Sequence, residues 1–252
     1  MLKVFYAILL TLICLQPAWS QKRYTAADVH SHNDYTRPNP FYQAFKAGVG
    51  AIEADVYLRN GKLMVAHDTA DIRPENTLKA MYLDPIKKEM GSHGRPLNLL
   101  IDLKESYTTL LPALIKEIAP LLPLMKTQKN NAKLAIIITG NRPLPSLYQN
   151  YPNYIVFDDD LQQPHTPAQW KRVAQVSLNF DNYSKWKGDG KMLTQDERAV
   201  RSIINATHRA GRKIRFWNAP DNAIAWQKLM DLGANILCTD KIGEITAFLK
   251  AN

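Results

Sequence analysis

The sequence predicts a single α/β domain built as a (β/α)8 barrel, also called a TIM barrel. Apolar, strand-like segments alternate with helix-like segments along the chain, which is the pattern of a parallel sheet covered by helices. Eight such strands fit into about 230 residues, slightly small for this barrel. A doubly wound sheet would usually open with a glycine-rich turn, and the sequence contains no GxGxxG motif.

The expected barrel strands are short apolar runs bounded by turn-forming residues. They cover residues 28–31, 51–58, 97–103, 133–139, 154–157, 176–180, 213–217 and 236–239. Asn60-Gly61 is a strong hairpin signal after the second strand, so residues 62–66 should return antiparallel to it.

The expected helices fill the gaps between the strands. Pro40 and Gly48 flank the first helix, and Gly211 and Gly233 close two later ones. Prolines should bend or divide the segment 107–125. The full set of expected helices is 40–47, 76–90, 107–125, 167–174, 194–210, 222–232 and 242–250.

The first 20 residues have the pattern of a secretory signal peptide. Lys3 precedes an apolar run over 4–15, and Ala18-Trp19-Ser20 provides small residues at the expected cleavage site. The run is too short for a membrane span, which needs about 20 residues. We therefore expect cleavage, a secreted or periplasmic location, and one domain over 21–252. Cys238 is then the single remaining cysteine, so no internal disulfide can form.

The charge of the chain favours anionic partners. The formal net charge is +9, and loss of Lys3 with the leader would leave +8. The sequence has no Lys/Arg block with interleaved aromatic residues, so a nucleic-acid partner is not expected. We expect a monomer that takes a small-molecule or lipid phosphodiester as its partner and contacts a membrane surface peripherally.

The residues that can carry chemistry gather near the expected strand ends, where barrel enzymes place their active sites. Residues two apart on a strand share a face, which pairs His30 with His32 and Glu53 with Asp55. Asp102 and Lys104 form the same kind of pair on the third strand. Carboxylates inside a barrel are costly unless they are paired or bound to a cation.

Two explanations of these acidic residues stay open. Asn33, Glu53, Asp55 and Asp102 would form an all-oxygen site, which suits Ca²⁺ or Mg²⁺ rather than zinc. The alternative is a structural cluster of ion pairs with Lys104 or Arg215.

The order SHND-Y, then EAD, a hairpin and HD resembles the phosphatidylinositol-specific phospholipase C and glycerophosphodiester phosphodiesterase superfamily. The resemblance implies that His32 is catalytic and that Asn33 binds the metal ion. It also implies that Glu53 and Asp55 are metal carboxylates and that His67 is the second catalytic histidine.

The resemblance extends over essentially the whole mature chain. NLLIDLK is similar to the third metal-carboxylate segment, with Asp102 where Glu is usual, and IRFWNAPD and LCTD resemble the run around a barrel Trp (Trp217) and a terminal Thr-Asp. The HSHNDY opening resembles most closely the branch that includes altered inheritance of mitochondria protein six. A glycerophosphodiesterase would begin with His-Arg-Gly, whereas His30 precedes Ser31-His32, so His30 is a second candidate for the first catalytic histidine.

These assignments predict a phosphodiester hydrolase with a Ca²⁺ or Mg²⁺ ion and histidine acid–base catalysis. Lys104 and Arg142 would offset phosphoryl charge, and Trp217 would line the leaving-group pocket. The substrate would be a glycerophosphodiester, a phospholipid or a phosphoinositide-like molecule.

Two other functions stay open. Asp28-x-His30-x-His32 also fits transition-metal phosphoesterase and amidohydrolase barrels, although further histidines at late strand ends are lacking. A secreted module that binds phosphorylated lipid or polyol without turnover is the non-enzymatic alternative.

Overall fold

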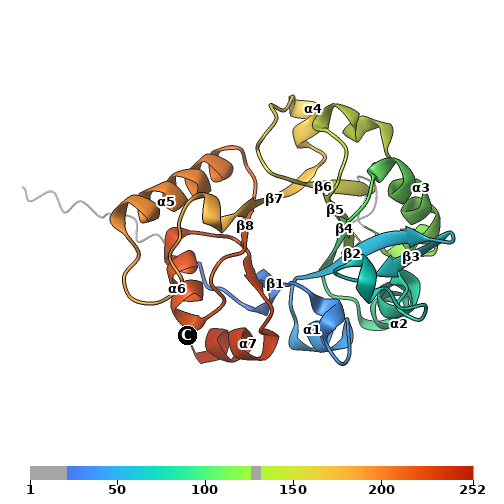
Figure 1. The fold of residues 1–252 in the computed structure, drawn as a ribbon, viewed down its shortest axis with the longest axis horizontal. Coiled ribbons are helices and arrows are strands. Elements are labelled where there is room, and N and C mark those ends of the chain that lie inside the picture. Colours follow the sequence, from blue (N-terminus) through green and yellow to red (C-terminus); the bar gives the residue numbers. More distant parts are fainter. Residues whose placement is uncertain (1–21, 126–131, 252) are drawn as a thin grey trace, which may run out of the picture.

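A computed structural model describes residues 22–125 and 132–251, so the predicted leader lies outside the described residues. Eight parallel strands curve into a barrel with helices on its outside (Figure 1). This confirms the predicted fold class. The barrel strands are β1 (Val29–Ser31), β2 (Ala51–Arg59), β4 (Leu97–Leu103), β5 (Leu134–Gly140), β6 (Ile155–Asp159), β7 (Val173–Asn179), β8 (Ile214–Trp217) and β9 (Leu237–Thr239).

The barrel is nearly closed. Its hydrogen-bonded order is β8-β7-β6-β5-β4-β2-β1-β9, so the two ends of the sheet are β8 and β9. Among the described residues these two strands meet through a single parallel bridge, between Arg215 and Ile236. β1 and β9 are three residues long, and they pair in register from Val29 opposite Leu237 to Ser31 opposite Thr239.

The predicted hairpin follows β2. Asn60 and Gly61 have φ values of 50° and 75°, and such positive angles at both central positions are what a tight hairpin turn requires. β3 (Lys62–Val65) then runs antiparallel to β2, with Val65 opposite Val56. The hairpin therefore returns the chain toward the C-terminal half of β2 and delivers His67 there.

The main helices alternate with the barrel strands. They are α1 (Tyr42–Ala47), α2 (Asp84–His93), α3 (Tyr107–Glu117), α4 (Pro167–Trp170), α5 (Thr194–Arg209), α6 (Ala223–Leu232) and α7 (Ile242–Ala251). α1 and α6 end at Gly48 and Gly233, which have φ values of 83° and 96°. No helix in the described ranges is long and apolar enough to cross a membrane.

Three helices differ from their predicted bounds by more than two residues. The predicted helix 76–90 begins as a π-helical turn (Lys79–Leu83), and α2 continues to His93. The segment 107–125 divides into α3 and a 3-10 helix (Ala119–Leu124), as its prolines indicate. The predicted helix 167–174 stops at Trp170, because β7 already begins at Val173.

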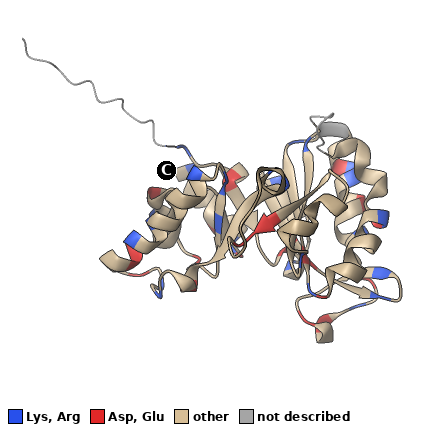
Figure 2. Cartoon of the chain, turned by 90° about the horizontal axis from the view of Figure 1, so that it is seen from above, with Lys and Arg blue, Asp and Glu red and all other residues tan. Residues whose placement is uncertain are grey.

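The apolar core fills the space between the strands and the surrounding helices, and most of its side chains are fully buried. A smaller apolar group lies inside the barrel and consists of Ala51, Leu100 and Ile137. Charged residues occur along the helices and loops and also within barrel strands (Figure 2). The charged residues within the strands build the site described next.

Candidate active site

An open cavity of about 670 Å³ lies at the C-terminal ends of the strands, where active sites of such barrels are found. Its walls carry histidines, carboxylates, cationic side chains and one tryptophan. Residues lining it include His32, Glu53, His67, Asp102, Lys104, Arg142, Asp158, Ser177, Arg215 and Trp217. It therefore unites residues from β2, β4, β6, β7 and β8 with residues that follow β1, β3 and β5.

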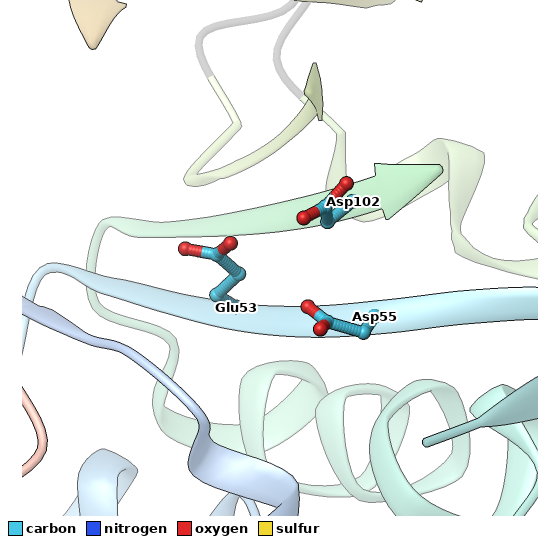
Figure 3. Close-up of side chains that lie close together, drawn as sticks. All are labelled: Glu53, Asp55 and Asp102. Atoms are coloured by element: carbon cyan, nitrogen blue, oxygen red, sulfur yellow. The ribbon is translucent and has the colours of Figure 1, made fainter. Parts of the chain in front are cut away.

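Three carboxylates converge beside this cavity, and two of them, Glu53 and Asp102, line it. Glu53 and Asp55 share a face of β2, and Asp102 stands directly opposite Asp55 on β4. One oxygen from each of the three lies within 4.8 Å of the others, and Figure 3 shows the groups turned toward one another. Such an all-oxygen donor set fits a hard divalent cation.

Gly140 creates the space that Asp102 occupies. It ends β5 with a φ of 69° and stands opposite Leu103 in the register of β4 and β5. A Cβ atom at this position would overlap Asp102 Oδ1 and lie 2.7 Å from the Leu103 carbonyl oxygen. Glycine is therefore required here by its backbone angle and by the close approach of the carboxylate.

Lys104 lies between two of the carboxylates. Its Nζ is 2.8 Å from Asp55 Oδ2 and 2.8 Å from Asp102 Oδ2. Partial burial disfavours the ammonium charge, but the carboxylates of Asp102 and Asp55 raise the pKa of Lys104 above its ordinary value. Burial and the charge of Glu53 raise the pKa of Asp102. The structural ion-pair arrangement considered for the sequence is thus present, beside a donor set that also fits a metal ion.

His32 is held by a carboxylate from the last strand's end. Its Nδ1 lies 3.0 Å from Asp240 Oδ1 and 3.0 Å from the Asn33 side-chain nitrogen. Burial would lower the pKa of His32, but the hydrogen bond to Asp240 and the charges of Glu53 and Asp240 raise it. With Nδ1 engaged in this way, the described residues offer no hydrogen bond to Nε2.

Tyr35 joins three of the predicted site residues. Its hydroxyl lies 2.9 Å from Asn33 Oδ1, 2.8 Å from Asp55 Oδ2 and 3.1 Å from His67 Nδ1. His67 Nδ1 is also 3.4 Å from Asp55 Oδ2, and its side chain is 57% exposed at the cavity rim. Asn33 thus reaches the carboxylate cluster through Tyr35, a residue to which the sequence analysis assigned no role.

His30 lies deeper than the cavity. Its Nε2 is 2.5 Å from Glu53 Oε2 and 2.6 Å from Arg215 Nη1, and the side chain is fully buried. Burial and the neighbouring Arg215 lower the pKa of His30 to about 4, so the imidazole is neutral near pH 7. This geometry gives His30 a place in the polar core of the barrel rather than at the surface of the cavity.

Arg215 links the two sides of the barrel interior. Its Nη1 pairs with Glu53 Oε2 at 2.8 Å, its Nε donates to Ser177 Oγ at 2.9 Å, and its Nη2 lies 3.7 Å from Asp158 Oδ2. Burial raises the pKa of Asp158 to about 6, although Arg215 acts in the opposite direction. Asp158 Oδ2 is buried without a hydrogen-bond partner, which marks it as an unsatisfied acceptor beside the cavity.

The two predicted substrate-binding residues both line the cavity. Arg142 follows β5, and its Nη2 pairs with Asp160 Oδ2 at 2.9 Å. Trp217 ends β8 and is 41% exposed, an unusual exposure for so large an apolar side chain.

Comparisons with known proteins agree with this architecture. A family model described as "AIM6-like phosphodiesterase domain" matches residues 21–96. An altered inheritance of mitochondria protein 6 homolog of Arthroderma benhamiae is 28% identical, over 85% of this chain and 81% of that protein. The protein of that name from Kluyveromyces lactis is 23% identical, over 88% of this chain and 72% of the relative.

Two solved structures share the fold. A glycerophosphodiester phosphodiesterase from Parabacteroides distasonis has a TM-score of 0.58 at 13% identity, with 90% of this chain and 95% of that chain covered. A putative glycerophosphoryl diester phosphodiesterase from Silicibacter pomeroyi has a TM-score of 0.55 at 12% identity, with 91% of each chain covered.

The chain therefore shares the (β/α)8 fold of these two solved structures. Its sequence is similar to the branch of altered inheritance of mitochondria protein six, as the HSHNDY opening predicted.

Proposed function

We propose that this protein is a secreted, metal-dependent phosphodiester hydrolase that uses His32 and His67 as its acid–base pair. The observation that carries the proposal is the position of both histidines on one cavity that lies beside three carboxylates within 4.8 Å of one another. Two separate proton-transfer groups beside a cation site can supply general acid–base and Lewis-acid catalysis for hydrolysis of a phosphodiester.

Glu53, Asp55 and Asp102 would hold the cation, and Asn33 would add an amide oxygen next to them. Their oxygen donors favour Ca²⁺ or Mg²⁺. When bound, such an ion supplies Lewis-acid stabilisation of phosphoryl oxygens. Lys104 and Arg142 line the same cavity and would offset the remaining negative charge of the phosphodiester.

The contact with Asp240 orients His32 to act as a general base. A carboxylate that binds Nδ1–H leaves Nε2 as the proton acceptor toward the cavity. His67 would act as the general acid or as a charge stabiliser, because it lies next to Asp55 and its side chain is exposed at the cavity rim.

For the substrate we propose a glycerophosphodiester, phospholipid or phosphoinositide-like molecule, with Trp217 against its leaving group. A solved structure with this fold is named a glycerophosphodiester phosphodiesterase, which supports this substrate class. The leader pattern over 1–20 supports an extracytoplasmic location.

One observation weighs against the transition-metal alternative. A His-x-His centre needs both His30 and His32 as ligands, whereas His30 Nε2 is enclosed by Glu53 and Arg215 in the barrel core. The non-enzymatic alternative would explain the shorter Asp102 in the place of a glutamate, but it gives no role to the paired histidines.

Hydrolysis of bis(p-nitrophenyl) phosphate tests the proposal. The protein is chelated, and Ca²⁺, Mg²⁺, Mn²⁺ or Zn²⁺ is added back singly. We expect Ca²⁺ or Mg²⁺ to restore turnover, His67→Ala to abolish it, and Glu53→Gln to abolish both turnover and cation-dependent thermal stabilisation. His208→Ala, on the outer helix α5, is the matched histidine control and should retain activity.

Turnover restored only by Mn²⁺ or Zn²⁺ would favour the transition-metal alternative. Full activity of His67→Ala would remove that residue from the mechanism. Cation-dependent stabilisation without turnover of this diester or of glycerophospholipid substrates would favour the binding module.

A further inference from the structure

Large apolar side chains are exposed mainly around the mouth of the cavity. Of the five in the described residues that are at least 36% exposed, four follow or end strands at this end of the barrel. Leu193 is 62% exposed, Ile224 is 55% exposed and Trp217 is 41% exposed; Leu144, after β5, is 58% exposed. Leu122 lies instead in the 3-10 helix that precedes β5.

Leu193, Trp217 and Ile224 lie on or next to two loops that contact each other. The segment between β7 and α5 contacts the segment between β8 and α6: Asn218 donates to Asp181 at 3.1 Å, and a Cβ added to Gly188 would lie 2.7 Å from Pro220 Cβ. An open groove of about 500 Å³ between these segments has Met192 and Ile224 in its lining.

Three lysines lie on the loop that precedes Leu193. Lys185, Lys187 and Lys191 lie on the β7–α5 segment, and the first two have side chains 76% and 74% exposed. Their ion pairs with Asp181 are long, at 3.6 and 3.9 Å, and exposed pairs of this kind contribute little. Leu193, Trp217 and Ile224 together with the three lysines are called the rim patch below.

We propose that the rim patch docks the protein on an anionic phospholipid bilayer. Exposed apolar side chains flanked by lysines suit the headgroup boundary, where the apolar groups insert and the ammonium groups meet lipid phosphates. The patch borders the cavity at Trp217, so docking would place the cavity mouth against the bilayer. A stable protein partner would usually bury about 800 Å² per side, more than three separate apolar side chains offer.

Flotation with vesicles tests the proposal without requiring turnover. The protein starts at Gln21, which removes the apolar leader and retains every described element. Vesicles contain phosphatidylcholine alone or phosphatidylcholine with phosphatidylglycerol. We expect binding to the mixed vesicles that weakens as salt rises, and weak binding to phosphatidylcholine alone.

Two substitutions remove apolar contacts at sites that accept an acidic residue. Leu193→Asp falls at the N-cap of α5, and Ile224→Glu falls in the first turn of α6, where carboxylates favour the helix. Each should weaken vesicle binding roughly tenfold. Lys187→Gln should weaken it about fivefold.

Leu122→Asp and Lys171→Gln are the matched controls, because both residues precede N-terminal strand ends on the far side of the barrel. They should bind vesicles like the unsubstituted protein. Absence of binding to the mixed vesicles at low salt would overturn the proposal, as would equal loss in patch and control variants. Self-association that Leu193→Asp abolishes, without vesicle binding, would assign the patch to a protein interface instead.

Discussion

Replacing Gly140 by alanine should displace Asp102 from the carboxylate cluster. A Cβ atom at Gly140 would overlap Asp102 Oδ1. The Leu103 carbonyl oxygen, 2.7 Å from that Cβ position, prevents the Cβ atom from shifting away from Asp102. Both neighbours belong to β4, which is hydrogen-bonded along its length to β5. The backbone of β4 is restrained by these hydrogen bonds, so the flexible Asp102 side chain must move away from Glu53 and Asp55.

The expected cost has two parts, and Gly211 separates them. Gly211 follows α5 with the same φ of 69°, but a Cβ atom there would meet nothing within 4 Å. Gly211→Ala should therefore cost only the left-handed backbone strain, about 1–2 kcal/mol of unfolding free energy. Gly140→Ala carries the same strain plus an overpacking cost of about 1–3 kcal/mol.

Urea denaturation followed by circular dichroism measures both variants, first without divalent cations and then with Ca²⁺. The cation-dependent increase in stability should persist in Gly211→Ala and weaken strongly in Gly140→Ala, since a cation site would lose one of its carboxylates. Equal unfolding free energies and equal Ca²⁺ responses for the two variants would refute the assignment of Asp102 to the cluster.

Three further predictions concern buried or half-buried groups. Burial raises the pKa of Asp158 from 3.8 to about 6, so its contribution to stability is present below pH 3.8 and is lost as the pH rises through 6. Asp158→Asn should remove this decrease of about 3 kcal/mol in unfolding free energy from a stability–pH curve. An unchanged curve would contradict the assignment. Arg215→Met should lower the unfolding free energy by about 3–5 kcal/mol because it leaves Glu53 buried without its guanidinium partner. Arg215→Lys keeps the positive charge and should lower the unfolding free energy less in the same urea titration. Tyr35→Phe removes a hydroxyl that contacts the Asp55 carboxylate and should lower the unfolding free energy by about 1.5–3 kcal/mol, whereas Tyr183→Phe, also at the cavity, should have little effect.

Most strands could be predicted because local signals and tertiary structure agree. The run Leu97–Leu103 is apolar at five of its seven positions and became β4 with the predicted bounds. The start of β7 was placed three residues late, because the helix that begins at Pro167 was predicted to continue to Ala174. The helix ends instead where Arg172 turns inward and donates to the carbonyl oxygens of Pro152 and Ile155, contacts that no local pattern predicts.

The candidate site was predictable where its residues share a strand. Alternation alone indicates that Glu53 and Asp55 face the same way. The partnership of His32 with Asp240 spans 208 residues and depends on which strands close the barrel. One signal could have indicated it: each residue directly follows a terminal strand, and in a closed barrel β1 and β9 are neighbours.

Two cationic side chains explain how three largely buried carboxylates coexist in one barrel wall. Lys104 pairs with both Asp55 and Asp102 from the cavity side, while Arg215 pairs with Glu53 from within the core. The two cationic side chains offset two of the three carboxylate charges, so the cluster keeps one unit of negative charge when all three carboxylates are ionised. It follows that a cation entering the cluster must displace or share the Lys104 ammonium, so its binding should add to the stability of an already folded barrel.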